Sequence, residues 1–109
     1  MKKFVLTHNA VVGFHFYPNA PKFCSYLENK HRHVFVIRCK FQVSHNEREI
    51  EINEQQNKIE SFLFATYGNP CDFGAMSCES IAQALMEYFP KIMECEVLED
   101  NYGGASLNR

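Results

Sequence analysis

Hydrophobic and polar positions alternate most clearly in the first part of the chain. Residues 31–44 (HRHVFVIRCKFQVS) are dense in β-branched and aromatic side chains, a composition typical of a strand. Residues 4–17 are rich in Val and Phe, and their only breaker is Gly13, so they predict a long strand bent or bulged near Asn9 and Gly13. The prolines and polar residues over 18–30 predict a loop. We therefore expect two long neighbouring strands joined by that loop.

The middle of the chain changes from a strand pattern to a helical one. Residues 44–47 are polar and predict a turn, and residues 48–52 alternate charged side chains with Ile, which predicts a half-exposed return strand. Asn53 is placed to cap a helix, with Glu54 in its first turn. Apolar residues then recur at helical spacing, at Ile59, Phe62 and Leu63.

The last third of the chain predicts one more helix and one more strand. The glycines and proline within residues 67–76 predict a loop, and Ser77 can cap a helix that ends before Pro90. Residues 92–98 predict a strand, and the glycine-containing tail after Tyr102 is expected to be mobile. The apolar face of the helix is formed by Ile81, Ala84, Leu85 and Tyr88.

The predicted element order is β-β-β-α-α-β, which indicates an α+β fold. It would have an antiparallel four-stranded sheet with two helices on one face. The chain has 109 residues, a length that predicts a single domain over residues 1–109. A domain this small buries a limited part of its surface, so assembly of several copies is expected.

Composition restricts the classes of partner and the cellular compartment that we expect. The net charge is -2 and the basic residues are scattered, so the chain lacks the basic face that nucleic acid requires. No apolar run approaches the roughly 20 residues of a membrane span, and no leader follows the basic N-terminal residues. Five cysteines without a C-x-x-C pair predict reduced thiols rather than a disulfide framework. We expect a cytoplasmic protein that binds neither nucleic acid nor membrane.

The chemistry of the chain is concentrated in its histidines. His31 and His33 are two positions apart on a predicted strand, so both imidazoles project from the same face. His15 lies on the preceding strand, which can bring it alongside the other two. Three neutral nitrogens around one zinc ion leave a fourth position open, the arrangement of catalytic rather than structural sites. An H-x-H pair alone is a weak signal because histidine fills many roles, and His15 strengthens it.

The other two histidines are expected to lie outside this cluster. His45 belongs to a polar turn and is interpreted as solvated. His8 is seven positions from His15, and an odd offset along a regular strand points its side chain to the opposite face.

Four motifs, in order along the chain, resemble the 6-pyruvoyl-tetrahydropterin synthase family, which includes the 6-carboxy-tetrahydropterin synthases. Residues 11–15 (VVGFH) stand where the family has F-x-A-x-H, and residues 31–33 (HRH) stand for H-G-H. Residues 76–79 (MSCE) align with P-T-x-E and retain the hydroxyl and the acid. Glu99 falls where the last strand of the family ends in a glutamate. The resemblance spans most of the chain.

The resemblance implies a T-fold (tunnelling fold), in which the sheets of several subunits join edge to edge into a barrel, typically in a hexamer. It implies that His15, His31 and His33 hold Zn²⁺ and that the metal binds the side chain of 7,8-dihydroneopterin triphosphate. It also implies that Glu99 holds the pterin ring, because a carboxylate can accept two hydrogen bonds from its guanidine-like edge, and that Ser77 belongs to the substrate site. Without the resemblance, Glu99 would be interpreted as a solvated acid at a strand end.

Two departures from the family pattern concern the catalytic groups. The family cysteine that lies four residues before H-G-H is Leu27 here, and Cys24 lies too far away to replace it by spacing. Glu28 instead forms E-x-x-H-x-H, which is similar to a family branch that uses glutamate and makes 6-hydroxymethyl-dihydropterin. A carboxylate can act as a general base there, and a solvated loop charge is the alternative interpretation.

The Asp-His pair of the family is also incomplete. Within residues 71–73 (CDF) the acid remains as Asp72, but Phe73 replaces the histidine, and phenylalanine cannot carry a proton. Arg32 replaces the middle glycine of H-G-H and either reaches a triphosphate or faces solvent.

These residues lead to three hypotheses. The first is a zinc-dependent lyase acting on 7,8-dihydroneopterin triphosphate, with Glu28 as base and Asp72 in support; the 6-carboxy branch, which makes a queuosine precursor, stays open. The second is a zinc- and pterin-binding protein that has lost turnover. The third is a structural T-fold module in which the histidines have no role.

Overall fold

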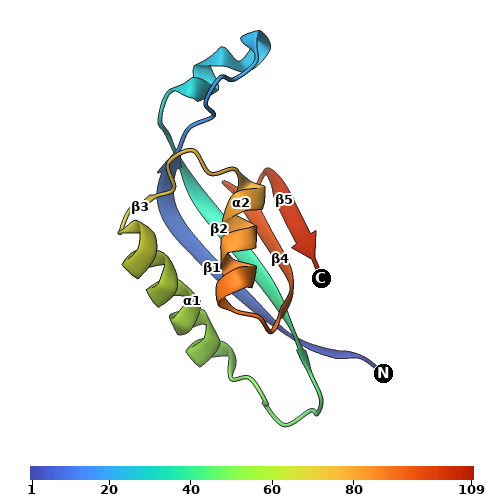
Figure 1. Cartoon of the computed structure of the whole chain (residues 1–109). Helices are drawn as coiled ribbons and strands as arrows, with labels where there is room; N and C mark the ends of the chain where they lie inside the picture. The colour runs from blue at the N-terminus through green and yellow to red at the C-terminus, as the bar shows by residue number, and fades with distance from the viewer.

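The computed structural model describes residues 1–109, which form one five-stranded sheet with helices packed against it (Figure 1). The strands follow the spatial order β3-β1-β2-β4-β5. In chain order the elements are β1 (Lys3–His15), the 3-10 segment η1 (Lys22–Glu28), β2 (His31–Val43), α1 (Ile52–Tyr67), β3 (Cys71–Asp72), α2 (Cys78–Tyr88), β4 (Ile92–Glu99) and β5 (Gly103–Asn108).

The pairing of the strands makes the sheet mixed rather than purely antiparallel. β1 pairs with β2 along its whole length, from Lys3 opposite Val43 to His15 opposite His31. β2–β4 and β4–β5 are also antiparallel, whereas β3 runs parallel to β1. The α+β class and the two α-helices on one face are confirmed (Figure 1). The expectation of four antiparallel strands is wrong. The sheet is open, and β3 and β5 are its edges.

The predicted return strand over residues 48–52 does not form. Arg48 adopts a positive φ of 54°, which a strand cannot accommodate, and the chain leads irregularly into α1. Glu51, not Asn53, caps the helix, because the Glu51 side chain accepts a hydrogen bond from the Glu54 N–H at 2.6 Å. Ile50, which suggested a strand by alternation, is half-buried against the core instead.

The tail after Tyr102 is strand β5, and the expectation that it is mobile is wrong. A Cβ on Gly104 would lie 1.9 Å from the carbonyl oxygen of Val97, so only glycine allows this close approach to β4. The guanidinium of Arg109 donates to the carbonyl oxygens of Ile92, at 2.7 Å, and Met86. Met86 lies in the last turn of α2, where a cation complements the free carbonyl groups. These contacts fix the tail to the body of the fold.

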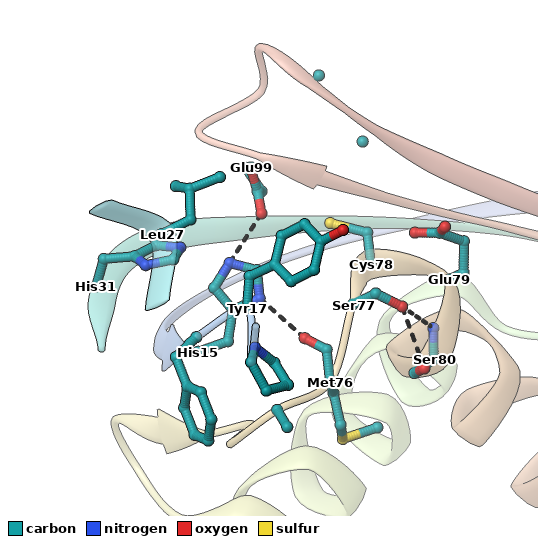
Figure 2. Close-up of a pocket in the computed structure, with 15 residues that line it drawn as sticks. His15, Tyr17, Leu27, His31, Met76, Ser77, Cys78, Glu79, Ser80 and Glu99 are labelled. Carbon is teal, nitrogen blue, oxygen red and sulfur yellow. Dashed lines mark hydrogen bonds and ion pairs between the residues drawn. The ribbon is translucent and has the colours of Figure 1, made fainter. Parts of the chain in front are cut away.

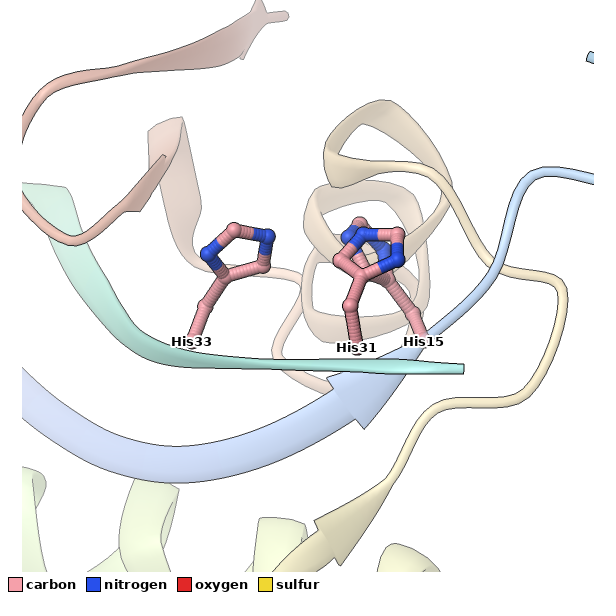
Figure 3. Close-up of side chains that lie close together, drawn as sticks. All are labelled: His15, His31 and His33. Atoms are coloured by element: carbon pink, nitrogen blue, oxygen red, sulfur yellow. The ribbon is translucent and has the colours of Figure 1, made fainter. Parts of the chain in front are cut away.

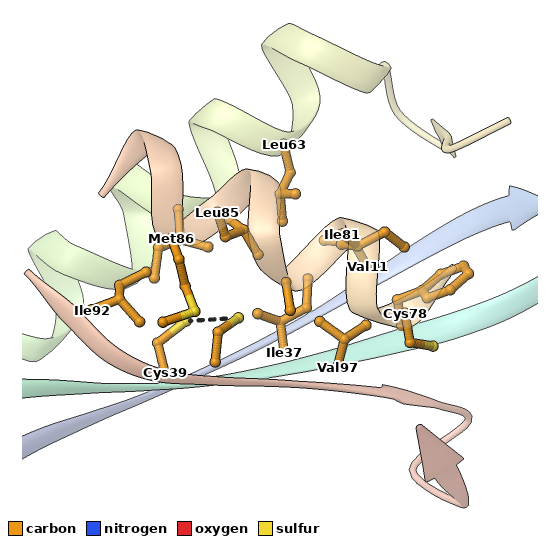
Figure 4. Close-up of a cluster of buried hydrophobic side chains, with 14 of the residues drawn as sticks. Val11, Ile37, Cys39, Leu63, Cys78, Ile81, Leu85, Met86, Ile92 and Val97 are labelled. Atoms are coloured by element: carbon orange, nitrogen blue, oxygen red, sulfur yellow. Dashed lines mark hydrogen bonds between the residues drawn. The ribbon is translucent and has the colours of Figure 1, made fainter. Parts of the chain in front are cut away.

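The core lies between the sheet and the two α-helices (Figure 4). Ile59 and Leu63 of α1 are fully buried, as predicted. On α2 the predicted Ile81 and Leu85 are buried, but Tyr88 is exposed and Ala84 only half-buried, and Ala82 and Met86 complete the face instead. The buried helical side chains pack on the inward side chains of the sheet, which include Val11, Phe35, Ile37, Cys39, Phe41, Cys95 and Val97.

All five cysteines are buried and unpaired. None of the helices is both long and apolar enough to cross a lipid bilayer.

Candidate metal centre

The three predicted histidines come together at the ends of the two long strands (Figure 3). His15 is the last residue of β1 and lies opposite His31, the first residue of β2, while His33 follows on the same face. One ring nitrogen from each residue can be chosen so that all three lie within 4.8 Å of one another. Two neighbouring strands therefore present three nitrogen donors to one point, and the group could bind a metal ion.

Each imidazole is held by a hydrogen bond from its other nitrogen. His15 Nδ1 lies 2.9 Å from the carbonyl oxygen of Met76, and His31 Nδ1 lies 2.8 Å from that of Asn29. His33 Nδ1 lies 2.7 Å from Oδ2 of Asp100. Carbonyl and carboxylate oxygens only accept hydrogen bonds, so each Nδ1 must be the donor. In the neutral rings the lone pair is then on Nε2, the pattern found in metal-binding histidines.

Two of the remaining ring nitrogens lack a hydrogen-bond partner within the protein. Nε2 of His15 and Nε2 of His33 are buried and make no hydrogen bond. Glu99 places one carboxylate oxygen 2.9 Å from the first and the other 3.8 Å from the second, without hydrogen-bond geometry. A carboxylate beside two nitrogen lone pairs favours a positive charge among them, which a cation or a proton can supply. The donor set and its charge therefore fit a bound cation.

Asp100 contacts the histidine cluster, and the sequence did not indicate this contact. Its two carboxylate oxygens contact consecutive residues of β2: Oδ2 accepts from His33, and Oδ1 accepts from the Val34 N–H at 2.8 Å. The hydrogen bond from His33, followed by that from Val34, lowers the pKa of Asp100 below its ordinary value. An acid at a strand end is a common turn residue, so the sequence gives no sign of this contact. Asp100 is 67 positions from His33 in the chain and lies beside it only in the folded structure.

A cavity of about 590 Å³ opens beside the cluster (Figure 2). His15 and His31 line one side, the N-terminal turn of α2 lines another, and Glu99 lies between them. Ser77 faces the cavity and caps α2, because its Oγ accepts from the Ser80 N–H at 3.1 Å. Two of the predicted substrate residues, Ser77 and Glu99, therefore share one cavity with the metal cluster.

Cys78 also lines this cavity, and its surroundings favour the thiol over the thiolate. Burial, with a smaller contribution from the nearby Glu99 carboxylate, raises the pKa of the Cys78 thiol to about 12. The thiolate is the reactive form, so this side chain stays protonated at neutral pH.

The predicted base Glu28 lies outside the cavity. It is exposed at the end of η1, whereas its neighbour Leu27 faces inward. Leu27 is fixed by a hydrogen bond from the Tyr17 N–H to its carbonyl oxygen, at 2.8 Å. Cys24 is buried within η1 and is not among the lining residues.

Asp72 and Phe73 lie away from the histidines. Asp72 is exposed and accepts from the Gly74 N–H at 3.1 Å and from Lys30 Nζ at 3.2 Å. These contacts lower the pKa of the Asp72 carboxyl group, the Gly74 hydrogen bond contributing most. The Phe73 ring is buried 4.9 Å from the rings of Phe35 and Tyr67. The position that the family fills with a histidine belongs to the core here.

The remaining polar candidates lie apart from the site. His8 is exposed on the opposite face of β1 from His15, as predicted. His45 is exposed in its turn and lies 3.6 Å from a Glu49 carboxylate oxygen. Arg32 is exposed between His31 and His33, so it points to the other face of the sheet.

No protein-family model matches the chain, and a comparison with curated proteins finds no match. The functional interpretation therefore depends on the chemistry of the site. Three neutral imidazoles suit a divalent transition metal, and zinc, copper, iron and nickel all accept such ligands.

Proposed function

We propose that this protein is a zinc-dependent lyase acting on 7,8-dihydroneopterin triphosphate, similar to the 6-pyruvoyl-tetrahydropterin synthase family. One observation carries the proposal. Each of the three histidines offers a ring nitrogen to a common point beside a cavity of about 590 Å³, and every Nδ1 is held by an acceptor. A cavity of this volume falls within the range typical of small-molecule sites.

The T-fold assembly is part of this proposal. The sheet has two open edges, β3 and β5, and both α-helices lie on one face. Such a subunit is suited to joining other copies edge to edge, because unpaired strand edges favour pairing with another chain. We expect a homo-oligomer, a hexamer by resemblance.

Glu99 and Ser77 are proposed to orient the substrate. The Glu99 carboxylate lies in the cavity and can accept two hydrogen bonds from the guanidine-like edge of a pterin. Ser77 presents its hydroxyl from the N-terminus of α2, close to the free N–H groups of the first turn. Both side chains would fix the ring while the three histidines define the position of its side chain.

Proton transfer is assigned to Glu28. A bound zinc ion would polarise a hydroxyl or carbonyl group of the substrate and ease removal of the neighbouring proton. Glu28 is one residue from Leu27, which faces the cavity, so a turn of the last residues of η1 would bring its carboxylate to the substrate. Asp72 is held by Lys30 and Gly74, and we assign it a supporting rather than a direct role.

A second function is favoured by Phe73. Its buried ring leaves no titratable group at that position, and Glu28 is exposed. A zinc- and pterin-binding protein without turnover would have this combination of a complete binding site and an incomplete proton relay.

Incubation of zinc-loaded protein with 7,8-dihydroneopterin triphosphate, followed by mass spectrometry, tests the proposal. We expect a 6-hydroxymethyl, 6-carboxy or 6-pyruvoyl pterin, and the product identifies the branch. Protein treated with a chelator is the matched control and should give no product. Unchanged substrate in the presence of confirmed zinc would contradict the lyase and favour the binding protein.

A further inference from the structure

The chain holds His33 by a carboxylate, whereas it holds the other two histidines by backbone carbonyl groups. His33 Nδ1 is 2.7 Å from Asp100 Oδ2, the shortest of the three contacts. Any residue can offer a backbone carbonyl, but only an acid offers a carboxylate. This contact therefore depends on the identity of residue 100.

The position of Asp100 is fixed by the backbone around it. The Asp100 N–H donates to the Val34 carbonyl oxygen at 2.8 Å, and the Val34 N–H donates back to Asp100 Oδ1 at 2.8 Å. Asp100 and Asn101 have φ values of 54° and 57°. They are the central residues of a turn between β4 and β5 in which the Tyr102 N–H donates to the Glu99 carbonyl oxygen. Asp and Asn are favoured where such turns need positive φ.

We propose that Asp100 is the positioning residue of the metal centre, holding His33 in the tautomer that leaves Nε2 free to bind the cation. The carboxylate cannot donate a hydrogen bond at neutral pH, so it requires the proton of His33 to be on Nδ1. It also adds a negative charge behind the ring, which makes Nε2 a better donor to a cation. This inference depends on the metal centre of the proposed function and not on its pterin chemistry.

Replacing one carboxylate oxygen of Asp100 by an amide nitrogen distinguishes the proposed positioning role from a role in the turn alone. In Asp100→Asn the side-chain oxygen can still accept from Val34, and asparagine tolerates the positive φ. The amide nitrogen would then face His33 Nδ1 as a donor. His33 would have to accept there, and its proton would move to Nε2, where it blocks metal binding.

The test measures zinc affinity by competition with a chromophoric chelator and, in metal-free protein, the imidazole tautomers by ¹⁵N NMR. For Asp100→Asn we expect zinc affinity to fall roughly 10- to 100-fold and the His33 proton to move from Nδ1 to Nε2. Glu96→Gln is the matched control. It removes the same charge from a half-buried side chain paired with Arg38 at 3.1 Å, and it should leave both readouts unchanged.

Each alternative outcome is distinct. Equal zinc affinity in Asp100→Asn and the wild type would overturn the inference and leave the metal centre intact. Weaker binding with an unchanged His33 tautomer would reduce Asp100 to a structural role, which also overturns it. A wild-type protein that binds no zinc would overturn the metal centre and the proposed function with it.

Discussion

The metal cluster, on β1 and β2, and the region around β3 are neighbours at the end of β1, and they differ in what their polar positions do. At the cluster, three imidazoles keep buried or half-buried nitrogens directed to one point, and each ring is held from behind. Around β3, Asp72 is tied to Lys30 at the surface and the neighbouring Phe73 fills the core. The first region contains unsatisfied buried polar atoms, whereas the second is filled by an aromatic ring.

This difference indicates which of the two regions is suited to binding a ligand. Buried polar atoms without partners destabilise a fold, so their presence in the cluster favours a bound ligand over a structural role. A buried aromatic ring stabilises the fold and carries no proton. In the proposed lyase, binding and proton transfer would therefore depend on different residues, and each can be tested alone.

The largest effect is expected from His31→Ala. Loss of one of three donors should abolish stoichiometric zinc binding, because the remaining two imidazoles cannot fill the coordination sphere from the protein. Metal content after dialysis against buffered zinc measures this. His8→Ala, which changes an exposed histidine on the opposite face of the sheet, should retain full zinc. Equal metal content in the two variants would contradict the cluster.

Glu28→Gln tests whether proton transfer has survived separately from the β3 region. If the wild type turns over, this variant should lose turnover by roughly 10²- to 10⁴-fold, the usual contribution of a general base, with zinc affinity unchanged. Steady-state rates with 7,8-dihydroneopterin triphosphate provide the measurement. Glu60→Gln, an exposed acid of α1, is the control. Full activity in Glu28→Gln would contradict our assignment of the base.

Gly13 and Phe73 test the packing side of the comparison. A Cβ on Gly13 would lie 2.8 Å from the Phe73 ring and 3.1 Å from the carbonyl oxygen of Cys71. Gly13→Ala should therefore lower the free energy of unfolding by about 1–3 kcal/mol. The loss should be smaller in a Phe73→Leu background, since the smaller side chain leaves room. A double-mutant cycle in urea measures this coupling, and additive losses would argue that the two residues are independent.

The smallest effect concerns alkaline pH, and it is shared by both regions. Burial raises the pKa of Cys71, beside Phe73, to about 11, and that of Cys78, in the cavity, to about 12, from an ordinary value of 9.0. The folded protein holds these protons after the unfolded chain has released its own, so the unfolded state binds fewer protons. The free energy of unfolding should then fall as pH rises above about 9.

Urea unfolding between pH 8 and 11 measures this decline. Cys71→Ala and Cys78→Ala should each reduce the slope, because each removes one of the responsible thiols. A free energy of unfolding that is constant over this range would contradict the raised pKa values. Iodoacetamide at pH 8 offers a second readout, since thiols that remain protonated and buried should react only after unfolding.

The sequence predicted the elements whose side chains carry a periodic pattern. The dense β-branched and aromatic residues of 31–44 and the apolar spacing of the two α-helices are reproduced in the structure. β5 could not be anticipated, because Gly103 and Gly104 are weak strand formers and the strand depends on close backbone approach to Val97. Residues 48–52 showed the opposite failure, since alternation over a short segment also fits an irregular entry to a helix.

The site divides in the same way. The three histidines could be predicted because their spacing places them on one face of paired strands. Their Nδ1 partners could not, because the carbonyl groups of Met76 and Asn29 have no sequence signature. Asp100 approaches His33 only after β4 pairs with β2. The three histidines are close in sequence, whereas two of the groups that orient them, Met76 and Asp100, lie in distant segments.

This separation along the chain has a consequence for the order of folding. His15, His31 and His33 all belong to the β1–β2 pair, whose contacts are local and form early, whereas Met76 and Asp100 arrive with distant segments. A chain emerging from the ribosome would bring its three imidazoles together before it could orient His15 and His33. Tight metal capture would then mark the end of folding rather than its beginning, and the rate of zinc uptake during refolding would report when β4 docks.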